Sequence, residues 1–210
     1  MWDCATGSGQ AALGLARHFR HVVATDASAS QVGHAPRLPG VTYHVATAEA
    51  SALAPRSVDL VTVAQAIHWF DFERFHGEVR RVTVPGGVLA AWSYGACHAG
   101  DDVESLLRDF EHREVGPYWH SNRRWVDEGY ATIPFPWPEI EAPGLQLRVR
   151  WTLRQLGLYL GSWSAVAAYR RDRGEDPVPR LLDRIAHHWG APDVVRDVEW
   201  PLALRVGRVE

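Results

Sequence analysis

Short apolar runs alternate with segments of helical periodicity through the first half of the chain. The runs predicted as strands are 2–4, 21–25, 41–45, 58–63 and 88–92. Apolar residues spaced three and four apart predict helices over 10–19 and 72–82. Between the second and third strands, Ser28 or Ser30 is suited to cap a helix that ends near Ala35. This strand–helix–strand order is typical of βαβ units, so the sequence predicts an α/β fold with a parallel sheet.

The second half of the chain has a different pattern, rich in aromatic residues and proline. Its predicted helices are 101–114, 156–171 and 179–189, and its predicted strands are 146–153 and 195–209, with an early break at Pro201. Aromatic residues concentrate over 116–143. Within this segment Pro134, Pro136 and Pro138 alternate with other residues, which excludes regular structure there. We therefore predict a single domain over 1–210 with an aromatic-rich cap insertion at about 96–143.

Composition and charge exclude several classes of protein. Hydrophobic residues make up 46% of the 210, enough for a packed core, and the net charge of -3 comes with no basic stripe of the kind that binds nucleic acid. No apolar run approaches the ~18 residues needed to span a bilayer, and the N-terminus does not resemble a signal peptide. The two cysteines, Cys4 and Cys97, make no disulfide framework. We expect a cytoplasmic protein, a monomer or a homodimer, that binds neither membrane nor nucleic acid.

The strongest chemical signal is the segment 3–10, Asp-Cys-Ala-Thr-Gly-Ser-Gly-Gln, at a predicted strand-to-helix turn. Gly7 and Gly9 allow a sharp turn and a close approach of the backbone to a ligand, and the helix that follows offers free N–H groups. Asp26 lies at the end of the next strand, where a carboxylate can accept hydrogen bonds from both ribose hydroxyls of a nucleoside. The loop does not choose the cofactor, because Gly7-x-Gly9-x-x-Ala12 also satisfies the dinucleotide fingerprint. An NAD-dependent oxidoreductase therefore remains an alternative.

Further motifs follow this loop in order along the chain. They are Ala-Glu-Ala-Ser-Ala-Leu at 48–53, Ser-Val-Asp-Leu-Val at 57–61, Ala-Gln-Ala-Ile-His-Trp-Phe-Asp at 64–71, Arg-Arg-Val at 80–82 and Pro-Gly-Gly-Val-Leu at 85–89. With the glycine loop, this ordered set resembles the class I S-adenosylmethionine-dependent methyltransferases. The segments 65–70 and 200–208 are similar to one subgroup, the trans-aconitate-type small-molecule methyltransferases. The resemblance covers 2–209, nearly the whole chain.

The resemblance implies a fold, a cofactor and a set of binding residues. The fold would be a Rossmann-like seven-stranded sheet with an antiparallel last strand and helices on both faces. The positions that match the motifs for S-adenosylmethionine are Gly7, Gly9, Asp26, Ala48, Glu49, Gln65 and Ala66. The glycines would pass beneath the amino acid part of the cofactor, Asp26 would hold the ribose, and Glu49 with the backbone N–H of Ala48 would contact the adenine. Gln65 and Ala66, which follow the fourth strand, would border the transferred methyl group.

Three features depart from the pattern of the family. Ala5 stands where relatives usually have the first glycine of the loop, and Thr47 stands where many have an aspartate that binds adenine. The chain also begins inside the first strand, so the N-terminal helix that covers the cofactor in relatives is expected to be missing. These departures keep open a second alternative, a degenerate methyltransferase-like module that binds without catalysis.

His68 is the candidate catalytic residue, since it follows the fourth strand at the sheet edge where ligands of doubly wound sheets bind. It could act as a general base or as a hydrogen-bond donor to the substrate, or it could only fix the loop. Trp69, Tyr118 and Trp119 are candidate substrate contacts, with packing of a small subdomain as the alternative. No metal site is expected, because the histidines lack ligand spacing. The function predicted is methyl transfer from S-adenosylmethionine to a small molecule.

Overall fold

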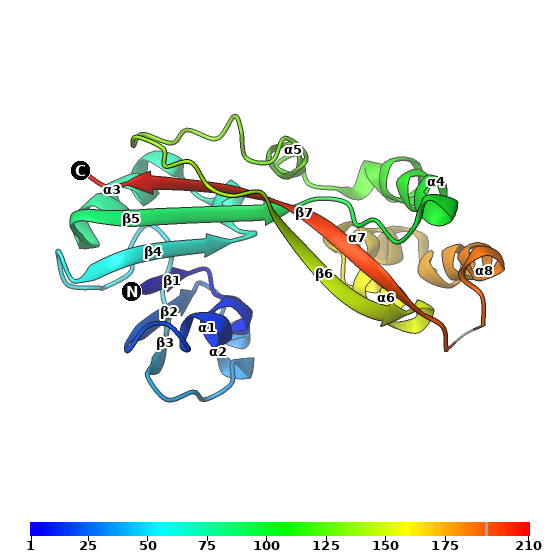
Figure 1. The fold of residues 1–210 in the computed structure, drawn as a ribbon, viewed down its shortest axis with the longest axis horizontal. Helices are drawn as coiled ribbons and strands as arrows, with labels where there is room; N and C mark the ends of the chain where they lie inside the picture. Colours follow the sequence, from blue (N-terminus) through cyan, green and yellow to red (C-terminus); the bar gives the residue numbers. More distant parts are fainter. Residues whose placement is uncertain (192) are drawn as a thin grey trace. The chain divides into compact units, whose positions relative to one another are not determined.

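The chain folds around a mixed sheet of seven strands in the order β3-β2-β1-β4-β5-β7-β6, as a computed structural model of residues 1–191 and 193–210 shows (Figure 1). The strands are β1 Trp2–Cys4, β2 Val22–Asp26, β3 Val41–Val45, β4 Val58–Ala64, β5 Thr83–Tyr94, β6 Leu145–Thr152 and β7 Val195–Arg208. Neighbouring strands from β3 to β5 run parallel, whereas β6 and β7 pair antiparallel. The predicted Rossmann-like α/β sheet, with helices around it and an antiparallel end, is confirmed.

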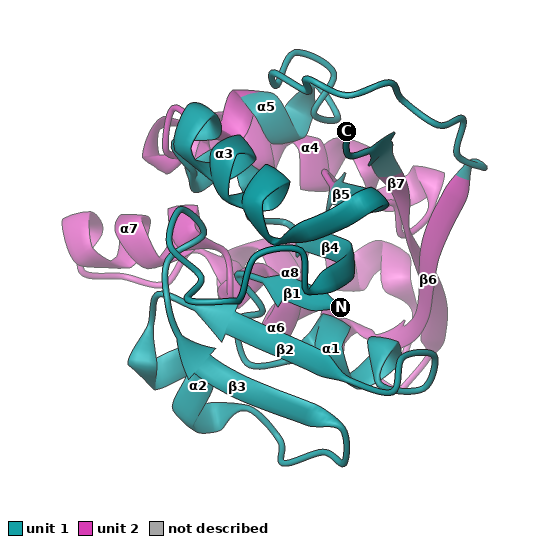
Figure 2. Cartoon of the chain, turned by 90° about the vertical axis from the view of Figure 1, so that its left-hand side faces the viewer, with its two compact units in different colours: residues 1–93, 125–144, 203–210 teal, residues 94–124, 145–202 magenta. Residues whose placement is uncertain are grey.

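Helices connect these strands, and the chain divides into two compact units (Figure 2). The helices are α1 Gln10–Leu15, α2 Ala29–His34, α3 Phe72–Val82, α4 Asp101–Asp109, α5 Arg123–Asp127, α6 Leu153–Gly161, α7 Ser164–Arg173 and α8 Val178–Trp189, with shorter helical turns η1 Ile67–Trp69, η2 Phe110–Glu114 and η3 Gly116–Tyr118. The first unit holds Met1–Ser93, Trp125–Gly144 and Ala203–Glu210; the second holds Tyr94–Arg124 and Leu145–Leu202. The aromatic-rich segment predicted at about 96–143 thus contributes residues to both units.

The first unit has an apolar core to which strands β1, β4 and β5 and helix α3 contribute. Helix α3 begins after Asp71, whose side chain accepts a hydrogen bond from the backbone N–H of Arg74, as an N-cap does. The helix buries Phe75, Val79 and Val82, which lie on one face at helical spacing. Burial of each such side chain stabilises the fold by about 1.5–3 kcal/mol. The core therefore fixes α3 against the strands that end at the predicted site.

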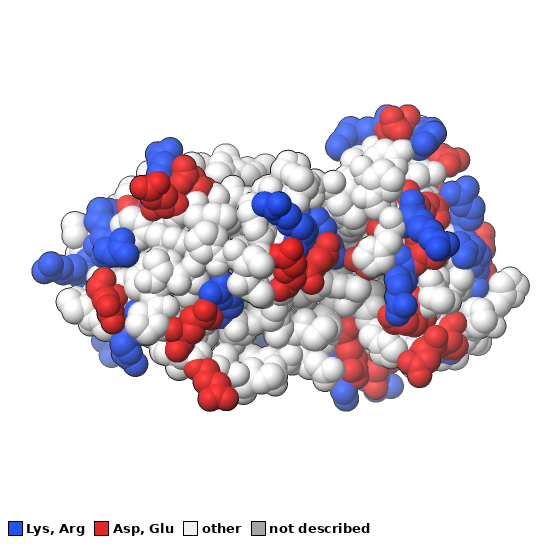
Figure 3. All heavy atoms as spheres, turned by 90° about the horizontal axis from the view of Figure 1, so that it is seen from above, with Lys and Arg blue, Asp and Glu red and all other residues white. Residues whose placement is uncertain are grey.

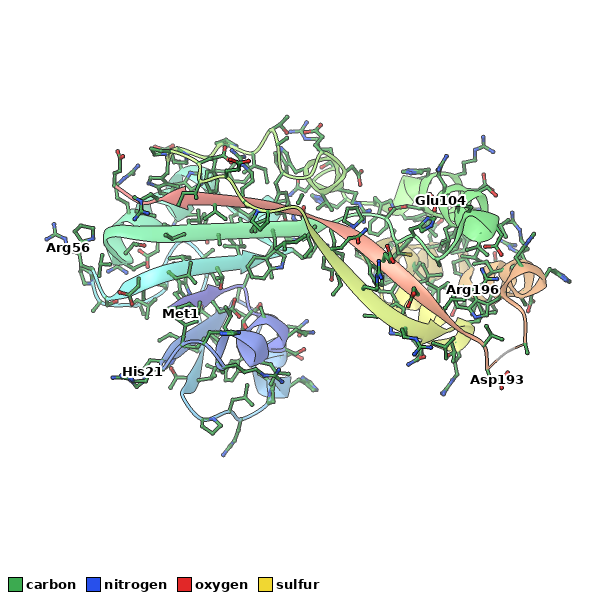
Figure 4. The ribbon with its side chains drawn as sticks, in the orientation of Figure 1. Met1, His21, Arg56, Glu104, Asp193 and Arg196 are labelled. Carbon is green, nitrogen blue, oxygen red and sulfur yellow. The ribbon has the colours of Figure 1, made fainter. Side chains whose placement is uncertain are left out.

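The second unit has its own core, built largely from the helices α4, α6, α7 and α8 and the first part of β7. Arg196 of β7, labelled in Figure 4, lies in the second unit. It donates hydrogen bonds to both carboxylate oxygens of Asp102 at 2.8 and 3.0 Å, and its guanidinium lies 5.2 Å from the ring centroid of Trp189. The indole N–H of Trp200 donates to the hydroxyl of Tyr159 at 3.0 Å, and burial raises the pKa of that phenol. These contacts tie the helices of the unit to its strands.

Two predicted boundaries in the first unit are wrong. The helix predicted over 10–19 ends at Leu15, because the chain turns beyond the low-propensity Gly14. Pro85 and Gly86 do not separate α3 from the fifth strand but lie inside β5, which begins at Thr83 directly after the helix. A register shift in the pairing of β4 with β5 accommodates these residues, as a β-bulge does.

Two further predictions are wrong in the second unit. The helix predicted over 156–171 is two helices, α6 and α7, separated where the backbone of Trp163 is extended. The helix α6 starts earlier than predicted because Thr152 and Gln155 form a capping box. Strand β7 is not broken at Pro201, which pairs with Gln146 in the antiparallel ladder. A proline removes only an N–H donor, so a strand can pass through it where the ladder does not need that donor.

Candidate active site

The predicted cofactor residues follow parallel strands of the first unit whose carboxyl ends lie at one edge of the sheet. Cys4 at the end of β1 is in register with Thr25 of β2 and Val63 of β4, and Asp26 is in register with Val45 of β3. The segments that continue from these ends therefore start side by side (Figure 1). This edge is where doubly wound sheets bind their ligands.

The glycine loop is held in a conformation that needs glycine and is tied to Asp26. Gly7 and Gly9 have positive φ angles of 59° and 89°. A Cβ on Gly9 would lie 2.7 Å from the hydroxyl oxygen of Tyr43, so no side chain fits there without a shift. The carboxylate of Asp26 accepts hydrogen bonds from the backbone N–H groups of Gly7 at 2.9 Å and Ser28 at 2.8 Å. A carboxylate has about four acceptor positions, so Asp26 retains capacity for ribose hydroxyls.

Ala5 takes the left-handed conformation that its place in the loop demands. Its φ is 54°, a region that costs an L-residue roughly 1–2 kcal/mol and costs glycine little. Gln65, directly after β4, has the same φ of 54°. Two non-glycine residues at this sheet edge are therefore strained, as is common where a backbone is shaped for a ligand.

A buried carboxylate lies beneath the loop, and the sequence analysis assigned it no role of its own. Asp3 is 0% exposed and accepts hydrogen bonds from the hydroxyls of Thr6 at 2.6 Å and Thr62 at 2.8 Å. Burial raises its pKa, although both hydroxyls oppose that shift. An acidic residue inside an otherwise apolar strand was the signal that could have singled it out. Asp3 therefore joins the start of the loop to the neighbouring strand β4.

The segment after β3 is fastened to helix α3. Ala48 is buried, and the Glu49 carboxylate accepts a hydrogen bond from the backbone N–H of Asp71 at 3.2 Å. Two residues further on, the backbone N–H and the hydroxyl of Ser51 both donate to Glu78 at 2.8 and 2.5 Å. Two hydrogen bonds of 2.7 Å join Glu78 to the guanidinium of Arg81. Burial would raise the pKa of Glu78, but the hydrogen bonds from Arg81 and Ser51 outweigh it and lower the pKa to about 2.

The segment after β4 carries the candidate catalytic residue. Ala66 is buried, and the turn η1 that follows presents His68 inward and Trp69 outward, with exposed fractions of 7% and 54%. The Nδ1 atom of His68 lies in a hydrogen bond of 2.9 Å with the hydroxyl of Tyr130. The two rings are 5.8 Å apart between centroids.

Tyr130 contacts the candidate catalytic residue, a relationship that sequence reasoning missed because it treated the tyrosine only as an aromatic residue of the predicted cap. It is 1% exposed and has a φ of 63°, which is rare for a bulky residue. Arg205 of β7 donates hydrogen bonds to the carbonyls of Tyr130 at 2.9 Å and Ile133 at 2.6 Å. Arg205 also forms an ion pair with Glu139. Gly129, directly before Tyr130 in an irregular segment, could have indicated a turn here. No sequence signal pairs Tyr130 with His68.

Two predicted substrate contacts lie in the second unit. The hydroxyl of Tyr118 donates to Asp172 at 2.7 Å, and the indole N–H of Trp119 donates to the carbonyl of Glu111 at 3.2 Å. The guanidinium of Arg123 lies 4.3 Å from the ring centroid of Trp119. Both aromatic residues thus have structural partners within their own unit, and their contact with a substrate stays a prediction.

Comparison with known proteins identifies this arrangement. Residues 2–91 match the model of a family described as a methyltransferase domain. A solved structure from Anaeromyxobacter dehalogenans, of a protein assigned as a type II methyltransferase, is 45% identical and superimposes with a TM-score of 0.92 over 99% of this chain and 88% of that one. The chain belongs to the S-adenosylmethionine-dependent methyltransferases. A Dictyostelium discoideum protein assigned as a methyltransferase is 28% identical over 99% of this methyltransferase and 81% of its own length. A Saccharomyces cerevisiae protein assigned as an S-adenosylmethionine-dependent methyltransferase is 25% identical over 83% of this chain and 72% of its own length.

The cofactor of the methyltransferase is S-adenosylmethionine, and the geometry of the first unit fits it. The glycine loop leaves no room for a Cβ at Gly9, and Asp26 retains acceptor capacity at the end of β2. These comparisons decide between the two cofactors that the glycine loop alone left open, and they make the methyltransferase an enzyme rather than a binding module.

Neither a metal site nor a membrane-spanning helix occurs in the described part of the methyltransferase. Within residues 1–191 and 193–210, histidine, cysteine, aspartate and glutamate side chains form no group of three or more that could hold a metal ion. The same residues include no helix long and apolar enough to cross a membrane.

Proposed function

We propose that this methyltransferase transfers the methyl group of S-adenosylmethionine to a small molecule and belongs to the trans-aconitate-type subgroup. The observation that carries the proposal is the position of His68 and Trp69, which follow β4 at the edge that also holds the glycine loop and Asp26. We also propose that the enzyme acts in the cytoplasm, as a monomer or a homodimer.

The chain's own residues divide the binding work by position along the sheet edge. Gly7 and Gly9 provide backbone that approaches the amino acid part of the cofactor, and Asp26 accepts from the ribose hydroxyls. The buried backbone at Ala48 and the carboxylate of Glu49 face the adenine. Gln65 and Ala66, where β4 ends, border the methyl group. Each assignment rests on the position of the residue in the fold and on the motif it matches.

The protein itself needs to do little covalent chemistry in this reaction. When bound, S-adenosylmethionine supplies a methyl group on a positively charged sulfur, which a nucleophile can attack directly. The protein contributes alignment and exclusion of water, and orientation alone can be worth about 7–11 kcal/mol. A carboxylate acceptor needs no base, whereas a hydroxyl or amine must lose a proton, and His68 is the candidate to receive it.

The surface chemistry favours a small acceptor over a nucleic acid. Arginine and acidic side chains are interspersed on the face seen in Figure 3, without the single-sign stripe that nucleic-acid binding requires. The half-exposed indole of Trp69 beside His68 offers a flat apolar contact for a small molecule, with the two rings 5.0 Å apart. This combination supports recognition by shape and by a few polar contacts.

Titration calorimetry and an acceptor screen test the proposal. The purified chain is titrated with S-adenosylmethionine and, as a control, with NAD; binding only of the former is expected. A panel of carboxylic acids, phenols and primary amines is then screened for formation of S-adenosylhomocysteine. Turnover with a panel member, reduced at least about tenfold in His68→Gln while cofactor affinity holds, is the expected result for a general base. Methylation of RNA or protein substrates but of no panel member would contradict the proposal.

A further inference from the structure

Strand β6 lies at one edge of the sheet, with β7 as its neighbour on the inner side (Figure 2). In the part of the chain that the structure describes, no strand pairs with the outer side of β6. We propose that this outer edge is a dimer interface, at which the β6 strands of two copies of the chain pair antiparallel about a two-fold axis at Leu147. Such a dimer does not depend on which molecule the enzyme methylates.

The backbone groups that β6 presents at its outer edge follow from a contact on the far side of β7. The N–H and C=O of Glu199 bond to the C=O and N–H of His98, both at 2.8 Å, so they point away from β6. Arg148 is in register with Glu199 and therefore makes no ladder hydrogen bonds with it. Because backbone groups alternate in direction along a strand, the N–H and C=O groups of Gln146, Arg148 and Arg150 point outward. They form a row of donors and acceptors that a second strand can pair with.

One face of β6 also leaves apolar side chains in solvent. Leu145 and Leu147 are 44% and 38% exposed, whereas Val149 and Trp151 on the same face pack against the core of the second unit. Monomeric proteins commonly protect an edge strand with proline or lysine, and residues 145–152 include neither. Exposed leucines beside outward backbone groups therefore favour pairing with another strand.

A second copy of β6 is complementary to this edge when the axis passes through Leu147. Each Leu147 then lies opposite Leu147 of the partner subunit, and Leu145 lies opposite the partner's Val149. The exposed leucines thus meet apolar side chains on one face of the extended sheet. On the other face, Gln146 lies opposite the partner's Arg148, so no two like charges face each other.

Charge selects this register over its neighbours. The guanidinium of Arg148 pairs with the Glu199 carboxylate at 2.7 Å, and the amide of Gln146 donates to the same carboxylate at 3.3 Å. Each Arg148 would therefore lie between its own Glu199 and the partner's Gln146. An axis one or two residues later in β6 would set arginines opposite each other, which is destabilising. An earlier axis would shorten the overlap of the two strands.

Sedimentation velocity of the intact chain, over a concentration series from about 1 to 300 μM, measures the association, because a small interface gives a weak dimer. We expect a monomer–dimer equilibrium. Leu147→Lys places two positive charges at the axis and should raise the dissociation constant at least about tenfold. Leu13→Lys, at a 45% exposed leucine of α1, is the control and should leave it unchanged. A wild-type chain that stays monomeric throughout, or Leu147→Lys that dimerises like the wild type, would overturn the proposal.

Cysteine cross-linking tests the register with a smaller change. Leu147 would form a non-hydrogen-bonded pair across the axis, with Cα atoms about 4.5 Å apart, which suits a disulfide. We expect a covalent dimer on mild oxidation of Leu147→Cys; the native thiols of Cys4 and Cys97 are buried. Leu145→Cys is the matched control, because its two copies would lie about 14 Å apart along the strands. No cross-link in Leu147→Cys, or an equal one in Leu145→Cys, would contradict the proposed pairing.

Discussion

The carboxylate of Asp26 accepts a hydrogen bond of 2.9 Å from the backbone N–H of Gly7, although the two residues belong to different strand ends. The contact means that the residue expected to hold the ribose also shapes the loop expected to pass beneath the cofactor. A substitution at Asp26 should therefore lower the affinity for the cofactor in two ways: it removes a hydrogen-bond acceptor for the ribose, and it loosens the glycine loop.

Asp26→Asn should weaken S-adenosylmethionine binding by about tenfold or more, because hydrogen bonds to a charged acceptor are worth roughly 1.5–3 kcal/mol. Calorimetric titration of the variant measures this effect. Asp59→Asn is the control, since Asp59 is an exposed carboxylate on β4. Equal affinity in the wild type and Asp26→Asn would remove the ribose role from this residue.

Gly9→Ala should destabilise the fold by about 1–3 kcal/mol, because the new Cβ meets the Tyr43 hydroxyl at 2.7 Å and the φ of 89° disfavours any L-residue. The double variant Gly9→Ala/Tyr43→Phe should recover part of that loss, since removal of the hydroxyl relieves the shorter contact. Gly14→Ala is the control, because a Cβ on this helical glycine meets nothing within 4 Å and should be neutral or stabilising. Denaturant unfolding of the wild type, Gly9→Ala, Tyr43→Phe and the double variant measures the coupling. Strictly additive effects would show that the strain lies in the backbone alone.

Glu78→Gln should loosen the segment that carries Ala48 and Glu49, because it removes the negative charge that accepts hydrogen bonds from Arg81 and Ser51. We expect a loss of about 1–3 kcal/mol in the free energy of unfolding and weaker cofactor binding. Glu73→Gln, an exposed position in the first turn of the same helix, is the matched control. Binding that is unaffected in a destabilised Glu78→Gln would show that the network serves stability and not the cofactor.

His76 should make stability depend on pH in mildly acid solution. Burial, reinforced by the positive charges of Arg80 and Arg205, lowers its pKa from 6.5 to about 4. Below pH 6.5 the unfolded chain takes up a proton that the folded protein does not bind until about pH 4. The free energy of unfolding should therefore fall as the pH drops through this window, by up to about 3 kcal/mol.

Denaturant unfolding at several pH values between 7 and 4 checks this expectation against His76→Phe. The variant keeps an aromatic ring beside Trp137, whose centroid lies 5.0 Å from that of the histidine, but it cannot titrate. Its free energy of unfolding should change less over the same pH window. Parallel curves for the two proteins would assign the acid sensitivity to other groups.

Local patterns were enough to predict the elements of the first unit and the cofactor loop. The helix α3 has the bounds expected from its periodicity, and Ser28 caps α2 by accepting from the N–H of Gln31. The glycine loop and Asp26 could be placed because parallel strands bring their carboxyl ends to one edge, whatever the details of packing. Such features depend on neighbours within a few residues, or on a topology that the motif order itself implies.

Only the tertiary structure decided the contacts that join distant segments. Tyr130 lies in an irregular stretch without periodicity, so no local signal pairs its hydroxyl with His68, and only the folded chain brings Arg205 to its carbonyl. Likewise, Pro201 predicted a break that the ladder of β6 and β7 does not show. Sequence by itself predicted the parallel strands through local propensity, and the family through the resemblance of its ordered motifs. The partners of the catalytic candidate required the fold, since a hydrogen bond across 62 positions depends on how the whole unit packs.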